Sequence, residues 1–411
     1  MNVTKLFLEI LKTVMRNVSY KEMPQLSGEQ WMELYRISEK QSVAPMIYQQ
    51  IYGTDAFLKA NPQFQAQWKM QTLNQAGNQA RRSALFLMLY EKMRQQGLSP
   101  LVVKGIVCRN LYINPDLRIS GDEDLLIPRD QFDRMDKLLL DEGFLRAELE
   151  DGKEYQEVGY QNPVNGLYLE IHMDLFARES GAYGHLNELF ANAFETYEIV
   201  EIQGTQILTL SAQEHFLYLV CHSLKHFLHS GFGIRQLCDI LYFAKEYRER
   251  IDWCEVNTVM REYHMYDFAM NLLNIGIENL GFSWEELGLR QPEDVVLDSL
   301  ELLDDMMDGG VFGKSSSNRV HSANITLNAA ENESANPVSG IAASLFPGKE
   351  YIRANYSYAR KYSALIPAAY LHRMFKYLRT RSEQKEEGEK SSTQIGMERV
   401  KLLEKYKIVD K

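Results

Sequence analysis

The sequence predicts an α+β fold in which a small mixed β-sheet lies between an N-terminal helical segment and a C-terminal helical domain. Three observations support this prediction. Apolar residues follow helical spacing up to about residue 97, short strand-like apolar runs then appear at residues 101–103, 125–127 and 167–173, and helical spacing returns at residue 212. The length of 411 residues allows two or three cores.

The N-terminal helical segment is expected to cover residues 1–97. Apolar residues recur every three or four positions at residues 6–15, 27–39 and 64–96, and Pro24, Pro45 and Pro62 interrupt the pattern. The sheet core is expected at residues 98–210. Within it, a helix over residues 129–142 should end at Gly143 and separate the second strand from the third.

The C-terminal helical domain is expected to cover residues 211–381. Residues 309–348 are rich in Ser, Asn, Gly and Ala, which predicts a long loop, and a last helix is expected at residues 366–381. Residues 382–411 form a charged tail with few apolar residues. We expect this tail to be flexible, with a short helix at its end.

Composition narrows the class of function. The formal net charge of −11 argues against an extended basic surface for long nucleic acids, because such binding depends on Lys and Arg displacing counterions. The sequence has no apolar run of about 18 residues, so no membrane span is expected. Its four cysteines lie far apart without a CxxC pair, which favours a reducing cytoplasm over a disulfide framework or a zinc knuckle.

Carboxylates at two of the predicted strands indicate a metal site. Asp122 and Asp124 follow Gly121 at the start of the second strand, and alternate residues of a strand share one face. The two acids should therefore project side by side, as hard oxygen ligands for magnesium. Glu170, in the strand LYLEIHMDLF, is the candidate third carboxylate.

Each of these acids has a purely structural interpretation as well, and so do three other residues of the same region, Lys104, Gly105 and Arg118. The two aspartates could belong to a turn after Gly121, and Glu170 could pair with a surface lysine. Lys104 could be a solvated residue at a strand end, and Arg118 could pair with Asp116 or Glu123. Gly105 could simply permit a tight turn.

The segment HSLKHFLH is a second candidate site. It places His222, His226 and His229 at helical spacings of four and three, an arrangement that can hold a metal ion in a hydrolase. Neither an HD nor an HExxH pattern accompanies the three histidines. A structural role is therefore favoured, with a histidine-centred metal hydrolase as an alternative.

Several segments together resemble a known family. The chain is similar to the largely uncharacterised bacterial nucleotidyltransferases of the DNA polymerase β-like superfamily. The similarity is carried by Lys104-Gly105, Leu111-Tyr112, Pro115, Arg118, the run GDEDLLI at residues 121–127, and LEIH at residues 169–172. The chain departs from the superfamily in having Lys-Gly-Ile where Gly-Ser or Gly-Gly is usual, and Glu123 where an apolar residue is usual.

The resemblance implies transfer of a nucleoside monophosphate from an NTP to an acceptor, with release of pyrophosphate. Asp122, Asp124 and Glu170 would be catalytic and would hold Mg²⁺, or Mn²⁺ in its place. Lys104, Gly105 and Arg118 would contact the nucleotide. The residues expected to line the substrate cleft are His172, Lys225, His226, Arg235 and Asp239.

The acceptor is not identified by the sequence and could be a small molecule, a protein or an RNA end. A catalytically silent descendant of the fold, which binds a nucleotide or a protein partner without turnover, is the main alternative.

Overall fold

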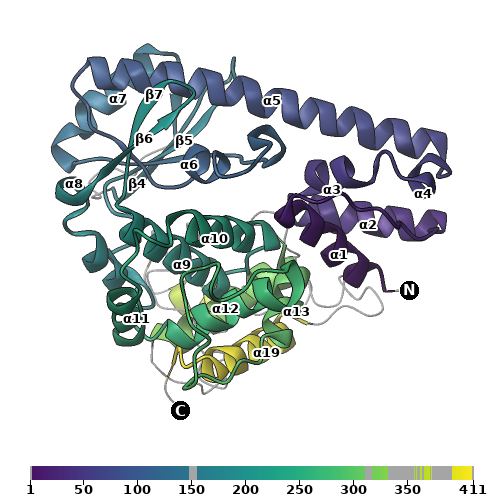
Figure 1. Ribbon diagram of the computed structural model, residues 1–411. Helices are drawn as coiled ribbons and strands as arrows, with labels where there is room; N and C mark the ends of the chain where they lie inside the picture. Colours follow the sequence, from purple (N-terminus) through teal and green to yellow (C-terminus); the bar gives the residue numbers. More distant parts are fainter. Residues whose placement is uncertain are drawn as a thin grey trace.

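The computed structural model describes residues 2–147, 155–310, 317–331 and 391–409, together with single positions and a short helical stretch between residues 356 and 372. The long helix α5 (Pro62–Gln95) runs from the N-terminal helices to the sheet and covers one side of it, while α9 and α10 lie on the opposite side (Figure 1). The predicted α+β class is confirmed.

Local signals at the helix ends explain where the N-terminal helices begin. Ser27 and Gln30 form a capping box at the start of α2, and the Asn61 side chain accepts from two backbone amides at the start of α5, where Pro62 needs no amide partner. The helices that precede α5 are α1 (Val3–Arg16), α2 (Gly28–Lys40), α3 (Ala44–Ile51) and α4 (Asp55–Leu58).

The main sheet has five strands in the order β1-β2-β5-β4-β3. The neighbouring strands β2 and β5 are parallel, and the other neighbouring pairs are antiparallel. The three strands predicted from sequence are all present, as β1, β2 and β5. The strands are β1 (Leu101–Val102), β2 (Glu123–Leu126), β3 (Leu145–Arg146), β4 (Glu157–Gln161) and β5 (Tyr168–His172), and a separate hairpin consists of β6 (Glu198–Ile202) and β7 (Thr205–Thr209).

The helix predicted after β2 is also present. It starts as the 3₁₀ turn η2 (Arg129–Gln131), continues as α7 (Phe132–Asp141) and stops at Gly143, whose φ of +81° is a conformation that favours glycine. The other short elements of this part are α6 (Gly105–Arg109), η1 (Pro115–Leu117), η3 (Gly184–Phe190) and α8 (Ala193–Thr196).

The two faces of the sheet have different surroundings. Leu125, Leu169 and Ile171 point to one face and join a buried cluster with apolar residues of α5 and α7. Asp124 and Glu170 alternate with them and point to the other face. Leu126, on that second face, joins the core formed by the helices, so the acids lie between the sheet and the C-terminal helical domain.

The N-terminal and C-terminal helices share one hydrophobic core. Phe7 and Ile10 of α1 belong to the same buried cluster as Phe268 and Leu272 of α12. Helix α5 bridges the two cores, because Trp68 belongs to the helical cluster, whereas its C-terminal part, including Phe86 and Tyr90, belongs to the sheet cluster. The sheet is thus an insertion between two parts of one helical body.

Helices make up most of the described C-terminal half. Ser211 and Glu214 form a capping box that starts α9, which is buried along most of its length. The helices are α9 (Ala212–Leu228), α10 (Ile234–Tyr247), α11 (Trp253–Glu262), α12 (Tyr266–Leu280), α13 (Leu300–Gly309), α14 (Ser317–Glu331) and α19 (Ser392–Lys405). No helix in the described part of the chain has both the length and the apolar composition needed to cross a membrane.

Helix α14 corrects the prediction of a continuous loop over residues 309–348. Arg319 is buried, its Nε donates to the Ser230 carbonyl at 2.6 Å, and its guanidinium pairs with Asp305 at 2.6 Å. The Thr326 hydroxyl donates to the Leu228 carbonyl at 2.5 Å. The helix buries small and hydrogen-bonded polar residues, so its sequence lacks the apolar periodicity that predicts helices. Residues 332–348 lie outside the described residues.

Helix α19 agrees with the short helix expected at the end of the charged tail, and it packs against the helical body. A capping box of Ser391 and Gln394 starts the helix, and the helix packs against α14. Arg399 is buried and donates to the His229 carbonyl at 2.6 Å. Of the helix predicted at residues 366–381, residues 366–370 and 372 are described and are helical, and the others lie outside the described residues.

A buried ion pair connects the sheet to the helical body. Arg118 lies just before β2 and is 0% exposed, and its Nε donates to Asp239 Oδ1 of α10 at 3.1 Å. The Tyr112 hydroxyl donates to the same oxygen at 2.8 Å. Burial favours the protonated acid, but the charge of Arg118 outweighs it and keeps the pKa of Asp239 below its usual value.

This connection predicts a large effect of Asp239→Asn. The substitution leaves a fully buried guanidinium without its counter-charge, so the free energy of unfolding should fall by about 3 to 5 kcal/mol. Urea denaturation followed by circular dichroism measures the change. The matched control is Asp294→Asn, because Asp294 pairs with Arg261 at 2.8 Å but its side chain is 61% exposed. Equal stability of the two variants would contradict the structural role of Asp239.

Candidate active site

Three potential metal ligands meet where β2 and β5 run side by side. In the parallel register Asp124 lies opposite Glu170, and Leu126 lies opposite His172. One ligand atom each from Asp124, Glu170 and His172 can be chosen so that all lie within 4.8 Å of one another. His172 Nε2 is 3.4 Å from Asp124 Oδ1 and 3.8 Å from Glu170 Oε2. We call these three residues the acid cluster.

The acids of this cluster have opposite pKa shifts. Burial raises the pKa of Glu170 to about 8, and the negative charges of Asp124, Glu157 and Asp122 add to the effect. Burial also acts to raise the pKa of Asp124, but Lys104 and His172 outweigh it and hold that pKa well below its usual value. One carboxylate is therefore charged in the absence of a bound cation, and the other is readily protonated.

His172 is buried and lies among acids. Burial disfavours its charged form, but the interaction with the nearby Asp124 carboxylate and the charges of Glu157 and Glu170 prevail and raise its pKa. Glu157 of β4 lies opposite His172 in the sheet, with its Oε2 3.5 Å from His172 Nδ1. Glu157 did not emerge from the sequence, because its position depends on the pairing of β4 with β5.

Asp122 does not join the acid cluster. Strand β2 begins at Glu123, so Asp122 lies before the strand and outside its pairing with β5. Asp122 is half-buried and close enough for its charge to raise the pKa of Glu170. Asp124 and Glu170 therefore form the cross-strand pair that was expected, and Asp122 lies at the edge of this pair.

Lys104 lies against the acid cluster. Its Nζ is 2.9 Å from Asp124 Oδ2 and 3.3 Å from His222 Nε2 of α9, and the residue is 7% exposed. Burial lowers the pKa of the ammonium group, but the charges of Asp124 and Asp122 more than offset it, so the pKa is raised. Lys104 is therefore not a solvated strand-end residue. Its contact with His222, between distant parts of the chain, is not evident from the sequence.

Glu123 and Gly105 explain the unusual turn after β1. Glu123 Oε2 accepts from the Ile106 amide at 2.7 Å, and its other oxygen pairs with Arg109. Gly105 has a φ of +48°, and a Cβ at this position would lie 1.9 Å from Glu123 Oε2. The charged residue between the two aspartates therefore fixes the turn that carries Lys104, and the turn requires glycine.

The three histidines of the segment HSLKHFLH separate into two groups. His222 Nε2 and His226 Nε2 are 3.2 Å apart, whereas His229 Nε2 contacts the Tyr183 hydroxyl at 2.9 Å. Burial lowers the pKa of His222 and of His226 well below the usual range. Among the described residues, the three histidines do not form a group of metal ligands, so the hydrolase alternative gains no support.

Other residues expected at the nucleotide or the substrate cleft lie in different places. Arg118 is fully buried against Asp239, which argues against direct contact with a nucleotide. Arg235 is also buried, and its guanidinium donates to the Ile119 carbonyl. Lys225 is half-buried in the last turn of α9, next to His226. Arg118, Arg235 and Asp239 thus form a structural junction beside the acid cluster.

The acid cluster is chemically suited to a divalent cation. Asp124 Oδ2 and both ring nitrogens of His172 are buried without a hydrogen-bond partner, although charged groups lie nearby. Lys104 approaches Asp124 Oδ2 as an ion pair without hydrogen-bond geometry. Two carboxylates fit Mg²⁺, and an imidazole beside them also suits Mn²⁺. The residues present therefore fit the metal that the sequence led us to expect.

The turn at Gly105 generates one prediction. Gly105→Ala places a methyl group against Glu123 and forces a positive φ on a residue with a Cβ, so the free energy of unfolding should fall by more than about 2 kcal/mol. Gly77→Ala is the control, because this helical glycine has open space around its Cβ position. That change should stabilise the protein by about 0.5 to 1 kcal/mol. Thermal and urea unfolding distinguish the two, and a Gly105→Ala protein as stable as Gly77→Ala would contradict the proposed turn.

Lys104 generates a second prediction. Lys104→Met removes the ammonium group from a buried carboxylate, so the metal-free protein should lose about 3 to 5 kcal/mol of unfolding free energy. In the control, Lys245→Met, the lysine is 39% exposed and lies 3.8 Å from Glu286, so little change is expected. Urea denaturation in the presence of a chelator measures both. A wild-type midpoint for Lys104→Met would show that Asp124 does not need this cation.

Comparisons with known proteins identify the family to which the chain belongs. A search of curated proteins and a search of solved structures each found no match to the chain. A family model described as "Uncharacterised nucleotidyltransferase" matches residues 27–276. The match runs from the start of α2 into α12 and includes the whole acid cluster, Lys104 and the α9 histidines. Since it covers more than half of the chain, this protein belongs to the uncharacterised nucleotidyltransferase family.

Proposed function

We propose that the protein transfers a nucleoside monophosphate from an NTP to an acceptor and releases pyrophosphate. One observation carries the proposal: Asp124 and Glu170 lie opposite each other on neighbouring parallel strands, beside His172. A family of nucleotidyltransferases provides the reaction class. Two acids held this close by backbone pairing repel each other unless a cation joins them.

In this proposal Asp124 and Glu170 hold the catalytic cation, Mg²⁺ or Mn²⁺, and Asp122 contributes a further oxygen from the edge of the site. When bound, the cation neutralises charge on the phosphates and makes the acceptor more nucleophilic. In this proposal Glu170 lies on the side of the cation that the acceptor approaches. Its raised pKa suits it to this position, because it can hold a proton when no cation is present.

The rest of the site orients the nucleotide. Lys104 extends from the turn after β1 to Asp124, so its ammonium group is placed where phosphates would meet the acids. His222 accepts from this ammonium group and fixes its direction. Gly105 lets the backbone turn closely around Glu123. His226, partly exposed beside His222, faces the acceptor side in this proposal.

A catalytically silent, nucleotide-binding protein is the second candidate, and two observations favour it. Lys104 already balances the charge of Asp124 at 2.9 Å, and Asp122 lies outside the acid cluster. A silent protein would bind an NTP with Mg²⁺ without releasing pyrophosphate in the presence of a cell extract that supplies acceptors. A pyrophosphate assay run beside calorimetric titration separates the two candidates.

The transferase proposal predicts the behaviour of two near-isosteric variants. Asp124→Asn and Glu170→Gln keep the side-chain shape but remove a charged ligand, so transfer of label from an α-labelled NTP into a cell extract should fall at least about a hundredfold. Asp130→Asn is the control, because Asp130 is an exposed acid of η2. Circular dichroism should show that all three proteins are folded. Wild-type labelling by either cluster variant would rule out its assigned role.

A further inference from the structure

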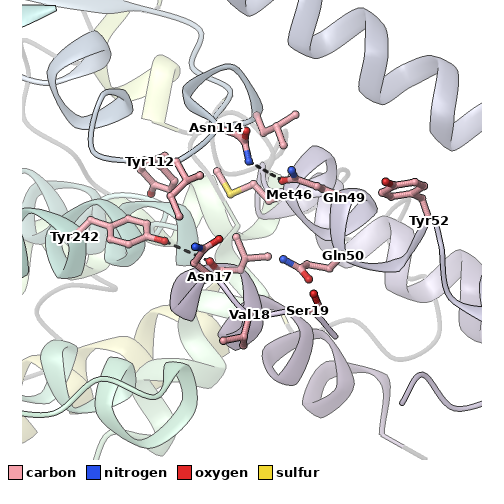
Figure 2. Close-up of a pocket in the computed structure, with 13 residues that line it drawn as sticks. Asn17, Val18, Ser19, Met46, Gln49, Gln50, Tyr52, Tyr112, Asn114 and Tyr242 are labelled. Carbon is pink, nitrogen blue, oxygen red and sulfur yellow. Dashed lines mark hydrogen bonds between the residues drawn. The ribbon is translucent and has the colours of Figure 1, made fainter. Parts of the chain in front are cut away.

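The described part of the chain also contains a pocket of about 270 Å³ that no residue of the acid cluster lines. It forms where α1, α3 and α10 meet the segment 112–117 (Figure 2). Met46 and Tyr112 are buried residues of its lining, and the side chains of Gln49 and Asn114 meet at one side of it. Neither Lys104 nor any member of the acid cluster lines this pocket.

The lining is free of charge. Charged residues make up 25% of the chain, yet none of the 13 residues drawn around the pocket is Asp, Glu, Lys or Arg. A phosphate, a nucleotide or a metal ion would meet no counter-charge here, and such ligands are normally bound by charged groups. The pocket is therefore suited to a neutral ligand, distinct from the substrate of the acid cluster.

The polar groups of the lining are mainly carboxamides. Asn17, Gln49, Gln50 and Asn114 each offer both a donor and an acceptor. Asn114 Nδ2 donates to Gln49 Oε1 at 3.3 Å, and the side-chain oxygen Oε1 of Gln50 accepts from the Tyr20 backbone amide at 3.3 Å. Hydroxyl groups match such a lining, because each hydroxyl also donates and accepts.

Large apolar residues are exposed on three separate segments around the same pocket. Val18 is 53% exposed, Tyr52 is 55% exposed and Ile113 is 61% exposed. Exposed apolar groups that gather at one hollow mark a binding site more often than scattered ones do. A ligand that presents an apolar C–H face next to a row of hydroxyls would cover both kinds of surface.

One wall of the pocket is held rigidly. The Tyr112 hydroxyl donates to Asp239 at 2.8 Å, and its ring packs edge-on against Tyr242 with centroids 4.7 Å apart. A wall fixed in this way loses little conformational freedom when a ligand binds. The wall that Tyr112 and Tyr242 form is thus present before a ligand binds, while the amide side chains at the rim can adjust.

We infer that this pocket binds a neutral carbohydrate. Asn17, Gln49, Gln50 and Asn114 would hydrogen-bond to the sugar hydroxyls, and Tyr52 would pack against a ring face. A neighbouring hollow shares Ser19, Gln49, Gln50 and Tyr52 with the pocket, so a chain longer than one sugar can continue along the surface. The inference does not rest on the proposed transfer reaction.

The test uses the full-length protein and a printed array of neutral saccharides that covers hexoses, deoxyhexoses and N-acetylhexosamines, free and in short chains. Saccharides retained on the array are then titrated calorimetrically. Gln49→Leu removes an amide and Tyr52→Ala removes the exposed ring, and each should weaken binding about tenfold. Leu73→Ala is the control, because Leu73 is 57% exposed on α5 and does not line the pocket. It should bind like the wild type.

Two results would overturn the inference. One is the absence of binding to every neutral saccharide on the array. The other is saccharide binding that Gln49→Leu and Tyr52→Ala leave within twofold of the wild type, which would place the sugar elsewhere on the molecule. Thermal unfolding should show that both variants are folded, as expected for changes at exposed side chains.

Discussion

The parallel pairing of β2 with β5 is the constraint on which the candidate site depends. It fixes Asp124 opposite Glu170 on the face of the sheet that is turned to the C-terminal helices. A buried acid and a half-buried acid at this spacing need positive charge, and Lys104 supplies it from the turn after β1. Glu123 and Gly105 hold that turn, so one strand carries both a candidate metal ligand and the support for its counter-charge.

The helical body completes the site from the other side. His222 of α9 contacts Lys104, and Asp239 of α10 binds Arg118, four residues before Asp122. The N-terminal and C-terminal helices share a core, so these contacts attach the inserted sheet to a single rigid support. Residues that are far apart in the sequence, between positions 104 and 239, therefore lie around one cluster of side chains.

The sequence allowed the fold class, the three strands that frame the site, and the pairing of Asp124 with Glu170 to be anticipated, because period-two alternation and a Gly-Asp-x-Asp run are local signals. It could not place Asp122 outside the cluster, since that depends on the residue at which β2 begins. The burial of Arg118 and the contact of Lys104 with His222 depend on how the sheet meets α9 and α10. Helix α14 was missed because it buries small and polar residues.

We propose that Asp124 and Glu170 together bind a divalent cation. Binding of Mn²⁺ by the full-length protein, followed by the loss of the free-ion electron paramagnetic resonance signal, tests it without depending on the acceptor. We expect the wild type to bind Mn²⁺. The affinity should fall at least about tenfold when either acid is replaced by its amide, and should stay unchanged in Asp130→Asn. Equal affinity in the wild type and both amide variants would contradict it.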